Sequence, residues 1–226
     1  MRFLVLGSGK TGSLVIEIAK QRHHHVEALR GAENQNAGAL TPERLKNCDV
    51  VIDFTTPSAV LSNITACIRA KKTMVVGTTG WHESLDRVRR EVEAAGTGFL
   101  YAANFSIGLN IFLEAARNAS EAIKHGYLPQ IFERHHKQKK DAPSGTALVL
   151  REVVRDVSGV APEITSFREG DVVGMHELVF DSPNDRIYLC HDSKSRRGFA
   201  EGAVLAAEWV AMKQGFFHFR DVWRDL

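Results

Sequence analysis

The stretch RFLVLGSGKTG, from Arg2 to Gly12, decides the fold. It begins with a short apolar run of the kind that forms a buried parallel strand. It continues into a G-x-G-x-x-G sequence made by Gly7, Gly9 and Gly12. Apolar residues at helical spacing follow, so we expect a helix over about 10–21. A strand, a glycine turn and a helix in this order are typical of a dinucleotide-binding fold.

Strands and helices continue to alternate through the first half of the chain. We expect strands at 25–30, 49–54, 73–79 and 98–105, with helices at about 58–70 and 82–95. This alternation predicts a Rossmann-type α/β fold with a parallel sheet and right-handed crossovers. Ligands bind at the carboxyl ends of such strands. The sequences at those ends are GSGKTG, LRG, DFTTP, GTTG and AANFS, all rich in residues that let backbone approach a ligand.

The glycine loop allows two other interpretations. Its Gly-Lys-Thr sequence suggests a P-loop, but that motif requires glycine where Leu4 stands. The other alternative is a glycine turn that binds no ligand. We favour a nicotinamide dinucleotide because the loop follows the first strand directly.

The choice of cofactor depends on the residues after the second strand. An NAD enzyme usually has an acid there for the ribose hydroxyls, but the sequence is Leu29-Arg30-Gly31, with no acid before Glu33. Arg30 suits a 2′-phosphate, which favours NADPH, with NADH as a further candidate. The alternative is that Arg30 is a solvated surface cation.

The pattern in the second half of the sequence predicts an α+β substrate domain. We expect helices at 107–125, 144–156 and 199–214, a strand at 127–136, and a hairpin of strands at 172–181 and 185–192. The dinucleotide domain would span residues 1–105 and the substrate and oligomerisation domain 106–202. The tail, about 203–226, would return to the first domain.

Composition excludes several function classes. The 226 residues carry 29 basic and 27 acidic side chains, a balance that gives little support to a nucleic-acid or membrane-surface partner. No segment approaches the roughly 20 apolar residues of a membrane helix, so we expect a cytoplasmic protein. Cys48, Cys67 and Cys190 lack disulfide or metal spacing, and we expect them to pack in or near the core as reduced thiols. His23–His25 reads as a solvated turn, and we expect no metal site.

The stretch HHKQKKDAPSGTA, residues 135–147, concentrates histidines and lysines before the start of a helix. Pro143 favours the first turn of that helix. The amides of Ser144, Gly145 and Thr146 would then be unpaired donors that, with the lysines, receive a carboxylate or phosphate. A nearby histidine could donate a proton after hydride transfer. These features predict a reductase of a small anionic substrate; the alternative is a basic surface loop.

The longer stretch ERHHKQKKDAPSGTA, residues 133–147, resembles the signature of the dihydrodipicolinate reductase family, E-x-H-H-x-x-K-x-D-A-P-S-G-T-A, at every fixed position. The segments DFTTP, VVGTTG, AANFSIGLN, REGDVVGMHELVF, SRRGFAEGAVLAAEWV and FRDV are similar to family segments in the same order. The resemblance implies NAD(P)H-dependent reduction of 4-hydroxy-tetrahydrodipicolinate to tetrahydrodipicolinate, in the diaminopimelate route to lysine. It also implies a homotetramer built through the second domain's sheets.

The resemblance implies a role for individual residues. His135 matches the acid/base and Lys139 the second proton donor. The substrate's carboxylates would be held by His136, Gly145 and Thr146, with Ser144 assisting and Lys137 as a further candidate. The implied cofactor contacts are Gly7, Ser8, Gly9, Lys10, Thr11, Gly12, Arg30, Gly77, Thr78, Thr79, Ala102, Ala103, Asn104 and Phe105. The glycine loop is one residue shorter than is common in the family and has Lys10 in place of arginine, which leaves the preference between NADH and NADPH open.

Two further alternatives stay open. The chain could be a related two-domain oxidoreductase that reduces a different cyclic dicarboxylate or imine. It could instead be a dinucleotide sensor that has lost the chemistry, although the His135/Lys139 pair argues against this.

Overall fold

A computed structural model describes residues 1–226, which divide into two compact units. The first unit comprises Met1–Ser106 together with Arg196–Leu226, and the second comprises Ile107–Ser195. The sequence placed these boundaries after residue 105 and near residue 202. No helix is both long enough and apolar enough to cross a bilayer.

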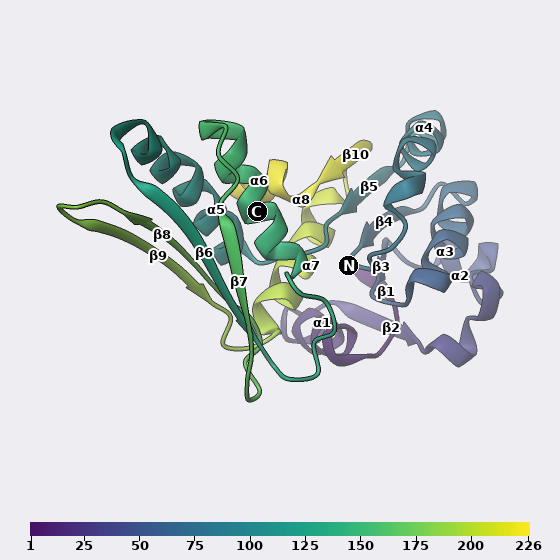
Figure 1. The fold of residues 1–226 in the computed structure, drawn as a ribbon. Coiled ribbons are helices and arrows are strands. Elements are labelled where there is room, and N and C mark those ends of the chain that lie inside the picture. The colour runs from purple at the N-terminus through teal and green to yellow at the C-terminus, as the bar shows by residue number, and fades with distance from the viewer. The chain divides into compact units, whose positions relative to one another are not determined.

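The first unit is built on a six-stranded parallel sheet with the strand order β10-β5-β4-β3-β1-β2 (Figure 1). The strands are β1 (Arg2–Leu6), β2 (His25–Leu29), β3 (Val50–Asp53), β4 (Thr73–Val76), β5 (Gly98–Tyr101) and β10 (Gly215–His218). Strand β1 pairs with β2 on one side and β3 on the other. The order of strands therefore reverses between β1 and β3, which is where sheets of this kind bind ligands.

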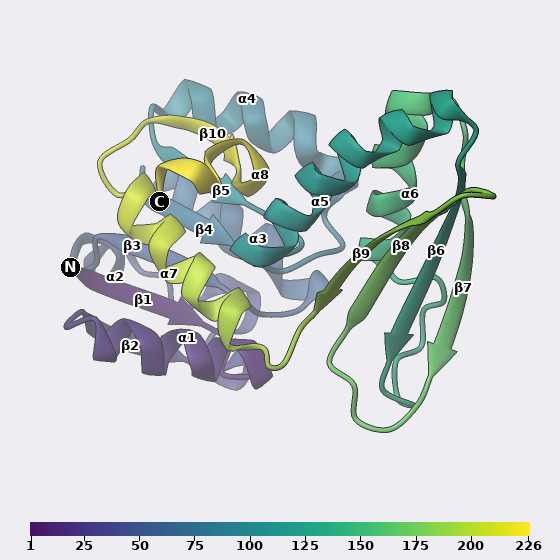
Figure 2. The ribbon, with the colours of Figure 1, turned by 90° about the vertical axis from the view of Figure 1, so that its left-hand side faces the viewer.

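Helices cover both faces of this sheet. They are α1 (Lys10–Gln21), α2 (Pro42–Lys46), α3 (Pro57–Arg69), α4 (Leu85–Ala95), α7 (Arg197–Val210) and α8 (Phe219–Val222), with short 3₁₀ turns at Gly31–Glu33, Gln35–Ala37, His82–Ser84 and Trp223–Asp225. Helix α7 packs along α1 and against β3, β4 and β5, and Figure 2 shows α1 and α7 side by side. Helix α3 contacts α4 and β4.

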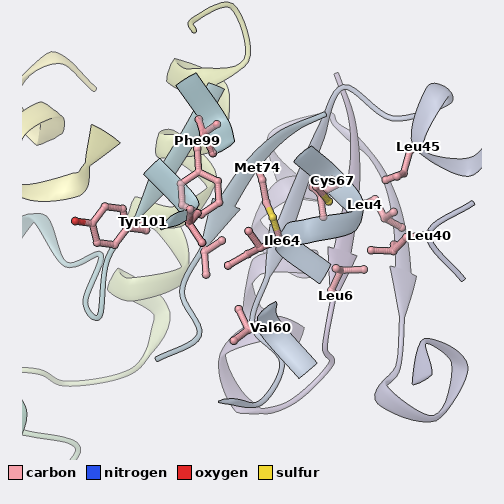
Figure 3. Packing of buried hydrophobic residues seen from close by; sticks show 14 of the residues in the cluster. Leu4, Leu6, Leu40, Leu45, Val60, Ile64, Cys67, Met74, Phe99 and Tyr101 are labelled. Carbon is pink, nitrogen blue, oxygen red and sulfur yellow. The ribbon is translucent and has the colours of Figure 1, made fainter. Parts of the chain in front are cut away.

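The strands are apolar because the sheet is covered on both faces. One core cluster includes Leu4 and Leu6 from β1, Met74 from β4 and Val60 and Ile64 from α3 (Figure 3). Cys48 and Cys67 are buried, as expected. Cys190 is exposed, so the expectation that it packs in or near the core is wrong.

The second unit has a four-stranded mixed sheet with the order β7-β6-β8-β9. The strands are β6 (Leu128–His135), β7 (Glu163–Arg168), β8 (Met175–Asp181) and β9 (Arg186–Asp192). Strands β6 and β7 are parallel, whereas the β6–β8 and β8–β9 pairs are antiparallel. Helices α5 (Ile107–Ala119) and α6 (Gly145–Ser158) pack on this sheet through a core that includes Phe112, Ile131, Leu150 and Leu178, and the 3₁₀ turn Ser120–His125 follows α5.

The predicted fold class, a Rossmann-type sheet followed by an α+β domain, is confirmed. The sequence missed β7 because its residues EITSFR are only partly buried and show no clear alternation. The expectation that all three histidines of His23–His25 are solvated is wrong for His24. Its Nε2 lies 2.7 Å from Glu208 on α7, and its ring packs against Phe3.

Candidate functional site

An open cavity of about 630 Å³ lies at the carboxyl ends of β1, β2 and β3. Its lining combines backbone with polar and apolar side chains from the ends of β1, β2 and β3, from the segments after them, and from α3. The lining residues are Leu6–Gly9, Leu29–Gly31, Asn34–Asn36, Phe54–Thr56, Ser58, Ala59 and Asn63. The cavity therefore lies where the strand order reverses, as expected for a nucleotide site.

The three glycines of the G-x-G-x-x-G motif, of which Gly12 already lies in α1, have different structural roles. A Cβ on Gly7 would lie 2.3 Å from the Phe54 carbonyl oxygen, and one on Gly12 would lie 2.1 Å from that of Gly7. Gly7 also has a positive φ of 88°. A Cβ on Gly9, in contrast, would meet nothing within 4 Å. Gly7 and Gly12 are thus required by packing, whereas Gly9 faces open space that a ligand can approach.

Helix α1 begins directly behind this loop and carries no capping side chain. Its N-cap is Gly9, which has no side-chain oxygen to accept from the first turn. The first N–H groups of a helix have no partner within the helix, and they lie at the positive end of its dipole. The loop and helix together fit a pyrophosphate, and Lys10 adds positive charge at the same end.

Arg30 lines the cavity and is exposed. The nearest acid in sequence is Glu33. Its carboxylate already has a partner, because it accepts a hydrogen bond from the backbone N–H of Arg30 at 2.6 Å. Glu33 is not among the residues that line the cavity. The position that an NAD enzyme gives to an acid is therefore bordered here by a guanidinium.

A buried carboxylate, Asp53, ties the loops of the cavity together. It stands at the end of β3 and accepts hydrogen bonds from the hydroxyls of Thr55 and Thr78, both at 2.7 Å, and from the Asn63 amide at 2.8 Å. Asn63 in turn accepts from Asn34 at 2.9 Å. These hydrogen bonds join the segments after β2, β3 and β4. No sequence motif indicates them, because Asn34, Asn63 and Thr78 belong to separate segments of the chain.

The structure brings only part of the predicted cofactor set to this cavity. Gly7, Ser8, Gly9 and Arg30 line it. The Thr78 hydroxyl is buried against Asp53, and Phe105 packs against Phe219. The residues of the predicted set that do not line the cavity are Lys10, Thr11, Gly12, Gly77, Thr78, Thr79, Ala102, Ala103, Asn104 and Phe105. Sequence reasoning missed Gln35, Asn36 and Ser58, which follow the ends of strands β2 and β3.

The second unit contains a polar cluster that the register of its sheet assembles. Glu133 and His135 are two residues apart on β6 and so face the same side. Across the sheet, His176 on β8 pairs with Glu133, and Arg168 on β7 pairs with His135. Glu133 is fully buried, and His135 and His176 are 6% and 4% exposed.

Glu133 accepts from several groups at once. Its Oε2 lies 2.5 Å from Nδ1 of His135, and its Oε1 accepts from Arg168 at 2.8 Å and from the backbone N–H of Ser144 at 3.2 Å. Burial alone would raise the pKa of the Glu133 carboxyl, but hydrogen bonds from Ser166, Arg168 and Ser144 outweigh it and lower the pKa to about 2. Glu133 is therefore ionised at neutral pH.

The two histidines are neutral at neutral pH. Burial lowers the pKa of His135, although the charge of Glu133 opposes the shift. Burial also lowers the pKa of His176, to about 4. The Nε2 atom of His176 lies 3.1 Å from the Ser144 hydroxyl, and the ring centroids of the two histidines are 5.2 Å apart.

The start of α6 differs from the expected anion receptor in two respects. Ser144 is the N-cap: its hydroxyl accepts from the N–H of Ala147 at 3.2 Å, so Pro143 lies before the helix and not in its first turn. The Ser144 N–H is bonded to Glu133 and is no free donor. The amides of Gly145 and Thr146 open the helix, where N–H groups lack helical partners.

The basic loop between β6 and α6 is held at both ends. The Lys139 ammonium lies 2.9 Å from the Asp141 carboxylate, and this hydrogen bond lowers the pKa of Asp141. The backbone N–H of His136 donates to the Val172 carbonyl at 2.8 Å. Lys137 and Lys140 are exposed. Thus Lys139, alone of the three lysines, is partly buried beside an acid.

Glu133, His135 and His176 also have the composition of a metal site, with ligand atoms within 4.8 Å of one another. All three already have partners: Glu133 contacts His135 and Arg168, and His176 contacts Ser144. The group is therefore a cluster of paired polar side chains.

Comparison with known proteins agrees with this geometry over the whole chain. The family described as dihydrodipicolinate reductase, N-terminus, matches residues 1–105, and its C-terminus counterpart matches residues 108–223. The chain belongs to the dihydrodipicolinate reductase family. This confirms the resemblance seen in the signature at residues 133–147.

Two relatives of this chain carry the same name. A protein of Christiangramia forsetii called 4-hydroxy-tetrahydrodipicolinate reductase is 35% identical over 240 residues, covering 100% of this chain and 99% of its own. One of the same name from Laribacter hongkongensis is 38% identical over 200 residues, covering 79% of this chain and 74% of its own. A dipicolinate-bound dihydrodipicolinate reductase from a Paenisporosarcina species shares the fold, with a TM-score of 0.79 at 24% identity over 98% of this chain and 99% of its own.

Proposed function

We propose that this chain is a 4-hydroxy-tetrahydrodipicolinate reductase, an NAD(P)H-dependent oxidoreductase of the diaminopimelate route to lysine. The observation that carries the proposal is the buried contact of Glu133 with His135, built beside the exposed start of helix α6. This arrangement places His135, which can carry a proton, next to the start of α6, where we propose that the substrate's carboxylates bind. The full family signature occupies this same segment.

The chemistry of the reaction determines which proton donors the chain must supply. Conversion of 4-hydroxy-tetrahydrodipicolinate to tetrahydrodipicolinate removes the hydroxyl as water and adds one hydride and one proton. His135 would deliver or accept protons at the substrate, because an imidazole nitrogen can take up and release a proton. Lys139 would serve as a second donor and stabilise the negative charge that develops as hydride arrives.

The substrate's carboxylates would bind at the start of α6. The N–H groups of Gly145 and Thr146 lie at the positive end of a 14-residue helix. His136 would add a further donor, and Lys137 a nearby positive charge. Ser144 would act through the helix, since its hydroxyl caps the first turn.

The cavity of the first unit would hold the nicotinamide cofactor, which supplies the hydride when bound. The fit rests on the open space beside Gly9 and the uncapped start of α1. We propose a preference for NADPH, because Arg30 lines the cavity and Glu33 is bonded to backbone. The other predicted contacts, including Lys10 and the segments 77–79 and 102–105, stay predictions.

We also propose a homotetramer formed through the sheet of the second unit. The face of this sheet that α5 and α6 do not cover is hollowed by a cavity of about 720 Å³, with apolar side chains at Leu128, Phe132, Phe167 and Tyr188. Leu128 is 73% exposed. Light scattering should give a tetramer that Leu128→Asp dissociates, whereas the matched change Met212→Asp, on the first unit, should leave it intact. A monomeric wild type would refute the assembly.

The test of the activity is oxidation of NADPH and NADH in a mixture with dihydrodipicolinate synthase, pyruvate and aspartate semialdehyde. Oxidation that requires the complete mixture supports the proposal. His135→Ala should reduce turnover about 10²–10⁴-fold without weakening nucleotide binding. Nucleotide binding without oxidation would instead favour a sensor, and oxidation with another cyclic imine alone would favour a related reductase.

A further inference from the structure

Glu133 divides its two carboxylate oxygens between different partners. Oε1 accepts from the Arg168 guanidinium and from the Ser144 backbone N–H, both of which can only donate. Oε2 is left for Nδ1 of His135, at 2.5 Å. The carboxylate cannot turn over without breaking these contacts, so its orientation toward His135 is fixed.

The proton in the Glu133–His135 contact must belong to the imidazole. Glu133 is ionised, because its hydrogen bonds hold its pKa near 2 against the effect of burial. An ionised carboxylate only accepts hydrogen bonds. Two unprotonated acceptor atoms would repel each other at 2.5 Å, so we infer that His135 carries its proton on Nδ1. In the neutral ring Nε2 then carries the lone pair.

We propose that Glu133 is a positioning residue: it holds His135 in the Nδ1–H tautomer and so makes Nε2 the atom that takes up and releases the proton during the reduction. The surroundings of Nε2 support this role. A Cβ added at Gly174 would lie only 3.0 Å from Nε2. The absence of a side chain there leaves this nitrogen room. The proposal rests on the proposed function for the identity of the reaction.

Other charged groups face His135 from each neighbouring element. Burial lowers the pKa of His135, Lys139 from the following loop and Arg168 from β7 lower it further, and Glu133 alone raises it. The neutral His176 faces it from β8. Removing the charge of Glu133 should therefore lower the pKa of His135 and move the alkaline fall of kcat/KM to lower pH.

The variant Glu133→Gln keeps the shape of the side chain at position 133 but should change the tautomer of His135. If its carbonyl oxygen keeps the bonds to Arg168 and Ser144, its NH₂ group faces Nδ1 and donates to it. The proton of the ring is then displaced to Nε2, the opposite tautomer. Loss of the correct tautomer at an otherwise intact site costs about 10²–10⁴-fold in kcat.

Nitrogen-15 NMR of histidine-labelled protein reports which ring nitrogen is protonated, and His135→Ala assigns the signals. We expect Nδ1–H in the wild type and Nε2–H in Glu133→Gln, with kcat reduced and KM little changed. Ser144→Ala is the matched control: it should raise KM through the start of α6 and leave the Nδ1–H tautomer in place. An Nε2–H tautomer in the wild type, or full kcat in Glu133→Gln, would overturn the proposal. The wild-type tautomer is independent of turnover, so an inactive wild type with Nδ1–H would refute only the proposed reaction.

Discussion

The hydroxyl of Ser144 lies 3.1 Å from Nε2 of His176, and both residues are buried. The same hydroxyl accepts from the N–H of Ala147 and so caps helix α6. A hydroxyl has one proton and two lone pairs, so it can accept from Ala147 and still share a hydrogen bond with Nε2 of His176. A strand histidine in its neutral form thus supports the first turn of the helix that we propose binds substrate.

The first prediction concerns stability in acid. Burial lowers the pKa of His176 from 6.5 to about 4, so between these values the unfolded chain binds a proton that the folded chain does not. Stability should therefore be complete above about pH 6.5 and fall as the pH drops toward 4, by on the order of 3 kcal/mol from this residue.

Urea unfolding at about pH 7.5 and about pH 4.5 measures this loss, and His176→Asn should show a smaller one. Glu133 does not obscure the comparison, since its pKa is lowered from 4.5 to about 2 and its contribution is lost only at lower pH. Equal losses in wild type and variant would assign the acid sensitivity to other groups.

The second prediction contrasts two glycines of the loop after β1. Gly12→Ala should destabilise the first unit by about 2 kcal/mol or more, because its Cβ would lie 2.1 Å from the Gly7 carbonyl oxygen. Gly9→Ala should unfold like the wild type but bind NADPH about tenfold more weakly, because its Cβ occupies only ligand space. Thermal unfolding and nucleotide titration test the pair. If Gly9→Ala binds NADPH as tightly as the wild type, the pyrophosphate does not lie beside Gly9.

The third prediction concerns Asp53. Asp53→Ala removes the acceptor shared by Thr55, Asn63 and Thr78, leaving buried donors unpaired, so we expect a loss of about 3 kcal/mol and weaker nucleotide binding. Glu91→Gln, which removes only an exposed pair with Arg87, should cost less than about 1 kcal/mol. If the two variants unfold alike in urea, the Asp53 network does not stabilise the fold.

The fourth prediction tests the choice of nucleotide. Arg30→Ala should lower kcat/KM for NADPH about 10–100-fold, the effect of one charge-assisted contact, and leave the value for NADH nearly unchanged. Arg69→Ala, which removes an exposed charge at the end of α3, is the control. A parallel fall with both nucleotides would mean that Arg30 does not contact a 2′-phosphate.

Local sequence patterns predicted much of this structure. The glycine loop predicted β1 and α1, because a turn that requires glycine is written in consecutive residues. The segment 133–147 likewise predicted a histidine and a lysine beside a helix start. Arg168 and His176 were not assigned to the site, because they meet Glu133 and His135 only through strand register. Periodicity also could not show that the Ser144 amide is bonded to a carboxylate eleven residues earlier.

The pairing of β10 with β5 has a consequence for biosynthesis. The last strand of the first unit is encoded after the whole second unit, and α7, which packs on α1 and on β3, β4 and β5, is encoded only slightly earlier. A ribosome that has released residues 1–106 has therefore delivered a sheet with one edge unpaired and with the α7 side of β3, β4 and β5 uncovered. The second unit is continuous in sequence and can complete its contacts before translation ends. The first unit can complete its contacts only after residues 196–226 have been synthesised.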